Sequence, residues 1–411
     1  MADEHRGNVL AFPQAPEAIE LRHLRAFVAV AEELNFGRAA DRLHISQSAL
    51  SRQVRALEQL LGLDLLRRTK HRVELTLAGE ALLDRARQLL EDVDGAVSAT
   101  LSVGGELAAR LTQLWAPMLE IATKDVDLEE RRQAYERFHA QFSPPDEVAV
   151  MHANAGGVPA LRFVPPGEGP GQILYLHGGG HVMGSAFGYR PLIAALALAA
   201  GSGAIAPEYR LAPEHPFPAA LDDSDRAYEW VISGGTPPEH VVLAGDSSGA
   251  GLVMSLLIRL RDQERPLPGG ALLFCPWLDL TGSTLRALAD VSEEVLLLRQ
   301  QSASLAASYL ADHPMDDPLV SPLTADLSGL PPLLVQAATG DTQREDAHQV
   351  TQRARAHGVD ARLELYPAET HAFQMFWSFL PEAKEGLERG GEFLRAVAGG
   401  AERAGSARRR R

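Results

Sequence analysis

Apolar residues recur at intervals of three and four between residues 21 and 61, a spacing that predicts several amphipathic helices. Two short apolar segments, at 65–66 and 73–75, flank a strongly basic stretch and could pair as a β-hairpin. A longer helical pattern begins after Thr76, whose hydroxyl is suited to cap the first turn. The Gly-Gly pair at 104–105 interrupts this pattern, so we expect the helix, and with it the first part of the chain, to end there.

The pattern changes after residues 106–142, which are again helical, and after Pro144 and Pro145. Short apolar runs rich in β-branched residues then alternate with helical stretches such as Tyr189–Ala200 and Asp346–His357. Because these runs are continuous rather than alternating, they predict an α/β domain whose mostly parallel, doubly wound sheet is covered on both faces. The predicted strands are Ile173–Leu176, Gly203–Ala206, Val241–Ala244, Ala271–Phe274, Leu333–Ala337 and Leu363–Leu365.

These patterns divide the chain into five segments. We expect a flexible tail at 1–18, a helical domain at 19–78, a linker or dimerisation helix at 79–105, the α/β domain at 106–398 and a disordered basic tail at 399–411. No apolar stretch is long enough to span a membrane, and the first twenty residues lack the apolar core of a secretion signal. A single cysteine excludes an intramolecular disulfide and a cysteine-based metal site, and it fits a cytoplasmic protein.

Charge is distributed unevenly along the chain. The formal net charge of −15 argues against nucleic-acid binding by the whole molecule. Residues 19–78, however, hold ten Lys and Arg against seven Asp and Glu, a net of +3, which leaves −18 for the rest. A locally basic module on an acidic body is compatible with DNA contact by that module alone.

Within this module, residues 36–61 predict two helices joined by a short turn, with Ser46 as the N-cap of the second helix. One face of the second helix is apolar. The other face carries side chains that are short, polar or basic near the start of the helix. Such side chains can hydrogen-bond base edges and phosphates. The spacing alone also fits an ordinary amphipathic helical hairpin with arginines on its solvent-exposed face. The candidate DNA-binding residues are Gln47, Ser48, Ser51, Arg52 and Arg55 on this helix, and Arg68 and Lys70 in the basic hairpin.

Residues 21–80 resemble the winged helix-turn-helix of LysR-type transcriptional regulators, in LRHLRAFVAVAEELNFGRAADRLHISQSALSRQVRALEQLLG and in the later stretches LLRRT and VELTLAGE. The resemblance implies binding of double-stranded DNA, a long dimerisation helix over about 76–98, and a homodimer that reads a roughly two-fold symmetric site. LysR-type regulators normally continue into a periplasmic-binding-protein-like effector domain, which the later patterns of this chain do not match.

Two glycine-rich motifs follow predicted strands. In the motif Gly245-Asp246-Ser247-Ser248-Gly249, between a strand and a helical stretch, Ser247 is placed on a tight turn as a candidate nucleophile. In the second motif, HGGG at 177–180, the backbone N–H groups of the glycines can converge on an oxyanion, although a flexible loop is the alternative. The oxyanion candidates are Gly179, Gly180 and Ser248, with Gly178 shaping the loop.

A serine nucleophile needs a histidine to take its proton and a carboxylate to orient that histidine. Hydrolases of this fold place them in the order Ser, acid, His. Asp341 and His371 have this order, and each follows a predicted strand at the carboxyl edge of the sheet. Glu345 and Asp346 remain alternative acids. The other histidines, including His181, His215 and His313, do not combine this order with this strand context.

Residues from about 106 to 398 resemble the hormone-sensitive-lipase-like carboxylesterases, in HGGGHVMGS, EYRLAPEHPFPAALDD, GDSSGAG, PWLDLT, DPLVSPLTADLSGLPPLLV and THAF. The resemblance implies an eight-stranded α/β-hydrolase core, a helical cap built partly from 106–142, short- to medium-chain acyl esters as substrates, and no cofactor. The chain departs from the family at Ser248-Gly249-Ala250, where Ala-Gly-Gly is usual, and at Gln343, where the acid motif usually has a leucine.

The sequence therefore predicts a serine carboxylesterase fused to a sequence-specific DNA-binding domain. The alternative is a LysR-type regulator whose hydrolase domain mainly senses a ligand. Both can hold if occupancy of the pocket biases dimer geometry and hence DNA binding. A third hypothesis is a fusion whose N-terminal module no longer binds DNA.

Overall fold

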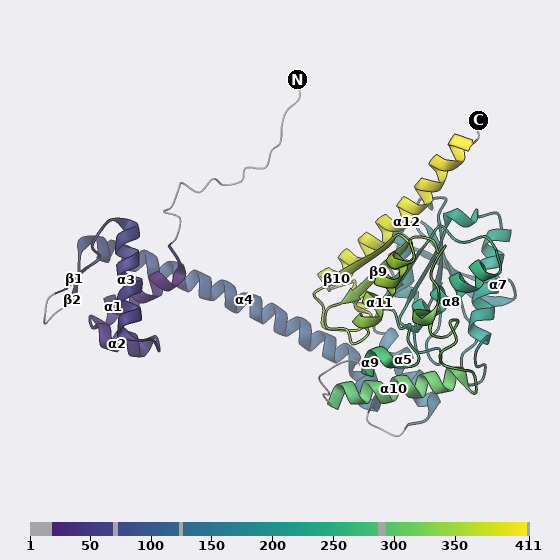
Figure 1. Ribbon diagram of the computed structural model, residues 1–411, viewed down its shortest axis with the longest axis horizontal. Helices are drawn as coiled ribbons and strands as arrows, with labels where there is room; N and C mark the ends of the chain where they lie inside the picture. Colours follow the sequence, from purple (N-terminus) through teal and green to yellow (C-terminus); the bar gives the residue numbers. More distant parts are fainter. Residues whose placement is uncertain (1–18, 69–72, 123–125, 287–292, 409–411) are drawn as a thin grey trace. The chain divides into compact units, whose positions relative to one another are not determined.

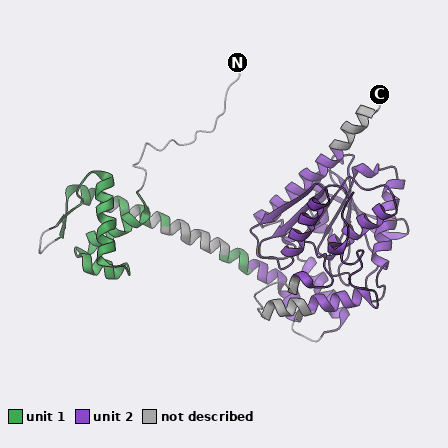
Figure 2. Ribbon diagram, viewed as in Figure 1, with its two compact units in different colours: residues 1–109 green, residues 110–411 purple. Residues whose placement is uncertain are grey.

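The computed structural model describes residues 19–68, 73–122, 126–286 and 293–408. The chain divides into two compact units, residues 1–109 and 110–411 (Figure 2). The flexible tail expected at 1–18 lies outside the described residues. Within the described residues, no helix combines the length and apolar character needed to cross a membrane.

The first unit is a small helical domain with a two-stranded sheet. Three helices surround one apolar core that includes Phe27, Leu50 and Val54. Ser46 caps α3 as predicted, because its Oγ accepts a hydrogen bond from the Ala49 N–H at 3.2 Å. The elements are α1 (Leu21–Glu33), α2 (Phe36–Arg42), α3 (Gln47–Leu61), and the antiparallel pair β1 (Leu66–Arg68) and β2 (Val73–Leu75).

The helix α4 (Leu77–Ala122) is 46 residues long, and the division between the units falls within it. Thr76 caps it as expected, since its Oγ1 accepts from the Gly79 N–H at 3.0 Å. The predicted break at Gly104 and Gly105 is wrong, because the helix continues through both residues. An interior glycine costs only about 1 kcal/mol against alanine, and the residues that follow the pair, Glu106, Leu107, Ala108 and Ala109, are good helix formers.

The second unit contains an eight-stranded sheet in the order β10-β9-β8-β7-β5-β6-β4-β3. Figure 1 labels two of these strands, β9 and β10. All neighbouring pairs are parallel except β3–β4 and β4–β6, so the predicted doubly wound, mostly parallel sheet is confirmed. The strands are β3 (Ala149–Ala155), β4 (Val158–Val164), β5 (Gln172–Leu176), β6 (Gly203–Pro207), β7 (Val241–Asp246), β8 (Gly270–Phe274), β9 (Leu333–Ala338) and β10 (Ala361–Tyr366).

Helices cover both faces of this sheet. The buried residues of α6 and α12 belong to one apolar cluster, and those of α7, α8 and α11 belong to the cluster on the other face. The helices are α5 (Leu128–His139), α6 (Arg190–Ala200), α7 (Ala219–Ser233), α8 (Ser248–Asp262), α9 (Ser283–Arg286), α10 (Glu293–Leu310), α11 (Arg344–Ala356) and α12 (Pro381–Arg408), with short 3₁₀ turns at Pro238–His240, Pro322–Thr324 and Phe373–Phe376.

The C-terminal segment differs from the expectation of a disordered tail at 399–411. Helix α12 continues to Arg408, and residues 409–411 lie outside the described part of the chain. Six of the eight residues from 401 to 408 are alanine, glutamate or arginine, so local propensity extends past Gly399 and Gly400 a helix that tertiary packing has already nucleated.

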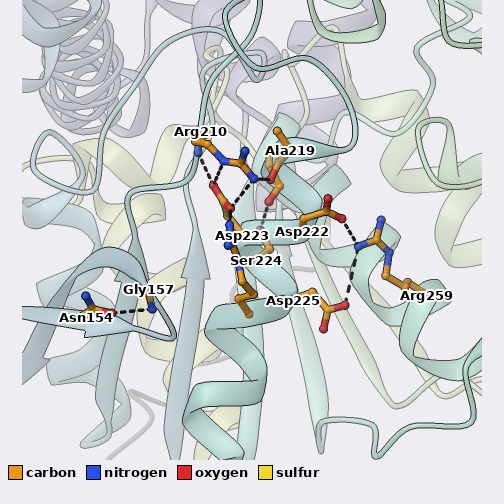
Figure 3. A network of polar contacts seen from close by, with 11 residues as sticks. Asn154, Gly157, Arg210, Ala219, Asp222, Asp223, Ser224, Asp225 and Arg259 are labelled. Carbon is orange, nitrogen blue, oxygen red and sulfur yellow. Dashed lines mark hydrogen bonds and ion pairs between the residues drawn. The ribbon is translucent and has the colours of Figure 1, made fainter.

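An ion-pair network ties α7 to α8 and to the loop before α7 (Figure 3). Arg210 donates from Nε and Nη2 to the two carboxylate oxygens of Asp223, each at 2.9 Å. Arg259 on α8 contacts Asp222 at 2.7 Å and Asp225 at 3.8 Å. Because α8 begins directly after Ser247, the network helps to fix the helix that follows the candidate nucleophile.

Candidate active site

Ser247 lies on the sharp turn between β7 and α8, with φ 50° and ψ −122°. This is an unfavourable backbone conformation for a residue with a side chain. The flanking glycines serve a different need. A Cβ on Gly245 would lie 2.7 Å from the Leu176 carbonyl oxygen, and one on Gly249 would lie 2.1 Å from the same atom. The glycines therefore let the turn pack against the end of β5, while the serine itself holds the strained conformation.

Asp341 and His371 lie beside each other after β9 and β10. His371 Nδ1 and Asp341 Oδ2 are hydrogen-bonded at 2.8 Å, and the Asp341 side chain has no exposed surface. The other Asp341 oxygen, Oδ1, accepts from the Gln343 N–H at 2.8 Å. The backbone of Gln343 thus helps to orient the carboxylate, although its side chain departs from the usual leucine.

The two alternative acids are engaged elsewhere. Asp346 Oδ2 accepts from the backbone N–H groups of Leu278 at 2.7 Å and Asp279 at 3.1 Å. Glu345 Oε1 accepts from the Gln349 side-chain amide at 2.9 Å. Of the three acids considered from the sequence, the one that contacts His371 is Asp341.

Ser247 and His371 line a common cavity of about 160 Å³, together with Gly179 and Gly180. Among the described residues, no hydrogen bond joins Ser247 Oγ to the His371 ring. Such bonds are often long or poorly aligned in enzymes without substrate and tighten when it binds. Trp115 and Trp277 also line this cavity, so two of the four tryptophans border the site.

The glycine-rich loop after β5 exposes backbone donors beside the serine. Gly179 has φ +113° and Gly180 has φ +66°, values that favour glycine. In the described part of the chain, the N–H groups of Gly179, Gly180 and Ser248 have no hydrogen-bond acceptor. The Gly178 N–H instead donates to Asp246 Oδ1 at 3.0 Å, so this donor is already engaged.

Asp246 anchors the loop, a role that sequence reasoning missed. Besides the Gly178 N–H, its carboxylate accepts from the hydroxyls of Tyr175 and Tyr189, both at 2.9 Å. Burial raises the pKa of Asp246 to about 6, and its hydrogen bonds with the tyrosines oppose that shift. The available signal was an acidic residue at the end of an apolar strand, where an unpaired carboxylate would be costly.

We expect Asp246→Ala to lower the free energy of unfolding of the second unit by about 3 kcal/mol or more, because three buried donors lose their acceptor. Hydrolytic activity should fall as well, since the loop loses its anchor. All four tryptophans lie in residues 110–411, so urea unfolding followed by tryptophan fluorescence reports this unit alone. The control is Asp262→Ala, at the exposed end of α8, which should shift stability by less than about 0.5 kcal/mol. Equal effects would contradict the anchoring role.

The pH dependence of hydrolysis should follow the ionisation of His371. Burial alone would lower its pKa, but the charge of Asp341 and its hydrogen bond outweigh burial and raise the pKa above the ordinary histidine value. The ring must be neutral to accept a proton, so kcat/KM should rise with pH through a pKa above that ordinary value. In Asp341→Asn this acidic limb should move to lower pH. If the acidic limb of the kcat/KM profile lay at the same pH in both proteins, the assignment of Asp341 as the partner of His371 would be contradicted.

One cluster of possible metal ligands overlaps this site. The Cys275 thiol, the Asp341 carboxylate and the His371 ring bring one ligand atom each to within 4.8 Å of one another. Burial raises the pKa of the Cys275 thiol well above its usual value, whereas a metal needs the thiolate. The carboxylate and ring atoms also bond each other. The donor chemistry therefore suits a structural thiol beside an acid–base pair better than a metal centre.

The candidate DNA-contacting residues of the first unit lie on α3 and in the hairpin. Gln47, Ser48, Arg52 and Arg55 are exposed along the first turns of α3, and Ser51 is half-buried. The opposite face of α3 packs Leu50, Val54 and Leu57 into the core. Arg68 falls in β1, and Lys70 lies outside the described residues.

Both units of the chain are similar to known proteins. The family model of the alpha/beta hydrolase fold matches residues 173–375, and that of the bacterial regulatory helix-turn-helix proteins of the lysR family matches residues 21–80. An acetyl-hydrolase of Streptomyces hygroscopicus is 38% identical over 283 residues, which are 67% of this chain and 93% of the relative.

Solved structures give the same result for the second unit. An esterase from the bacterial hormone-sensitive lipase family is 38% identical with a TM-score of 0.65, and the match covers 70% of this chain and 98% of that one. EstE5, in a crystal soaked with p-nitrophenyl butyrate, is 35% identical with a TM-score of 0.62, covering 67% and 93%. The chain therefore belongs to the hormone-sensitive-lipase family of α/β-hydrolase carboxylic ester hydrolases, and it carries a lysR-family helix-turn-helix domain in its first unit.

Proposed function

We propose that Ser247, His371 and Asp341 form the catalytic triad of this esterase. The observation that carries the proposal is the 2.8 Å hydrogen bond between Asp341 and His371 beside a serine on a strained turn. Ser247 Oγ attacks the ester carbonyl carbon while His371 Nε2 takes the hydroxyl proton. Asp341 holds the ring through Nδ1 and stabilises the imidazolium that forms.

The tetrahedral intermediate carries its negative charge on the former carbonyl oxygen. The N–H groups of Gly179, Gly180 and Ser248 are the donors proposed to bind this oxyanion. His371 then gives its proton to the departing alcohol, which leaves Ser247 acylated. Water attacks the acyl-enzyme, with His371 again acting as base, and the carboxylic acid and free serine are restored.

The proposed substrates are short- to medium-chain acyl esters. The relative from Streptomyces is named an acetyl-hydrolase, and crystals of the similar EstE5 were soaked with a butyrate ester. The test is hydrolysis of p-nitrophenyl esters from acetate to decanoate by the full chain. A maximum of kcat/KM within this series supports the proposal, whereas a folded protein that cleaves none of them contradicts it.

We also propose that the first unit binds double-stranded DNA sequence-specifically through α3, as a homodimer. The exposed polar and basic residues at the N-terminal end of α3 suit base and phosphate contacts in the major groove. A cytoplasmic location, expected from the sequence, would give this unit access to DNA.

The double variant Arg52→Ala/Arg55→Ala should bind DNA at least about tenfold more weakly, because each arginine contributes a phosphate or base interaction. The slope of log K against log salt should also become shallower by about one for each phosphate that the variant leaves unneutralised. Duplexes selected from a random pool, measured by fluorescence anisotropy, supply the probe. Arg22→Ala, on α1 and paired with Glu20, is the control. A control that weakens binding as much as the double variant would argue against α3 as the reading helix.

A further inference from the structure

A second cavity, of about 420 Å³, lies in the second unit. Its wall is mostly apolar, with Met118 and Ile121 from α4, Leu128 from α5, Val182 from the loop after β5 and Leu305 from α10. The volume is within the range of small-molecule sites, and an apolar lining suits a hydrocarbon chain.

The two cavities share part of their walls. Trp115, Met183, Gln301 and Leu305 line both this cavity and the one that contains Ser247. Trp115 is held in place by two contacts. Its Nε1–H donates to Thr370 Oγ1 at 2.9 Å, and its ring stacks on that of Phe138 with 4.3 Å between the ring centroids. The apolar cavity therefore adjoins the cavity that contains Ser247 at these four residues.

The helix that supplies this wall also belongs to the DNA-binding unit. At its other end, Leu82, Leu83, Ala86 and Leu90 of α4 pack with the core of α1, α2 and α3. One helix thus takes part in the packing of the helix-turn-helix at its start and in the lining of a candidate ligand site at its end. The hydrolase relatives match about two thirds of the chain, so they do not account for this second connection.

We infer that the apolar cavity binds the acyl chain of the ester, and that its occupancy is sensed by α4 and changes the affinity of the first unit for DNA. The inference rests on the proposed esterase, because the chain is delivered by acylation of Ser247. Each methylene that is buried in the cavity should strengthen binding about fourfold. Because longer chains bury more methylenes, they should make more contact with α4. A ligand shifts a conformational equilibrium only through such differential contacts, so a chain too short to reach α4 should have little effect.

The test uses two covalent adducts of the full chain, formed with the p-nitrophenyl ethyl esters of methylphosphonic and octylphosphonic acid. Ser247 Oγ forms a bond to phosphorus, p-nitrophenolate leaves with the electron pair of the broken P–O bond, and the hydroxyl proton passes through His371 to solvent. Intact-mass measurement confirms a single adduct. Hydrogen–deuterium exchange is then compared over residues 77–90 and 110–122, and DNA affinity is measured on duplexes selected from a random pool.

The octyl adduct should slow exchange in both segments of α4 and change DNA affinity by about five- to 150-fold, whereas the methyl adduct should do neither. Met118→Trp, which fills the cavity, should remove the difference between the adducts. Met315→Trp, at an exposed position, should preserve it. Adducts that give equal exchange in α4 and equal DNA affinity would overturn the inference and leave the esterase intact. Failure to form any adduct at Ser247 would contradict the esterase proposal and the inference with it.

Discussion

Replacing Ser247 by alanine is expected to lower kcat for p-nitrophenyl ester hydrolysis by about 10⁴- to 10⁶-fold. The substitution removes the only proposed nucleophile and leaves the oxyanion donors, which are backbone groups. The residual rate should therefore still exceed that of the uncatalysed reaction. Initial rates at saturating and limiting ester concentrations separate the loss in kcat from any change in KM.

The matched control is Ser255→Ala on the same helix. Ser255 is buried, and its hydroxyl donates to the Gly251 carbonyl oxygen at 2.9 Å, so the change removes a similar group away from the cavity. We expect this variant to keep its activity within a few-fold of the parent chain. Comparable losses in the two variants would indicate that damage to α8, rather than loss of a nucleophile, explains the result.

Asp341→Asn should lower kcat by about 10⁴-fold, because an amide cannot hold the imidazole in the required tautomer or stabilise the imidazolium. The side chain has no exposed surface, and its Oδ1 accepts from the Gln343 N–H, so the asparagine should occupy nearly the same place. The measurement is kcat across a pH series, which distinguishes the loss of His371 as a base from a shift in its pKa.

Glu345→Gln provides the control for this second prediction. It makes the same carboxylate-to-amide change four residues later, at an acid whose contact is with Gln349 on α11. Its activity should stay near that of the parent chain. An active Asp341→Asn protein, or an equally inactive Glu345→Gln protein, would mean that the acid has been assigned wrongly.

The parts of the fold that follow from continuous apolar runs were predictable. All six predicted strands are present in the central sheet. Five of them are apolar runs, because a strand buried on both faces needs apolar residues at nearly every position, whereas β10 is partly exposed. The local order of strand, motif and helix also placed Ser247 after β7 and the glycine-rich loop after β5. These two strands are neighbours in the sheet.

Other features depend on contacts that a one-dimensional pattern does not contain. The hairpin of β3 and β4 escaped prediction because β3 is largely exposed and lacks a continuous apolar run. The uninterrupted course of α4 through Gly104 was missed because glycine lowers helix propensity without forbidding a helix. The anchoring role of Asp246 depends on two tyrosines, Tyr175 and Tyr189, that the fold brings together from separate elements. The proposed triad and DNA-contacting residues stay predictions until they are tested.

The most direct test of the proposed catalytic triad is to locate the reactive serine chemically. The full chain is treated with phenylmethylsulfonyl fluoride, digested, and mapped by mass spectrometry while residual esterase activity is followed in parallel. The proposed triad predicts one sulfonyl adduct, on the peptide that contains Ser247, and activity that falls in proportion to the labelled fraction. A label on another residue, or full labelling of Ser247 with undiminished hydrolysis, would contradict it.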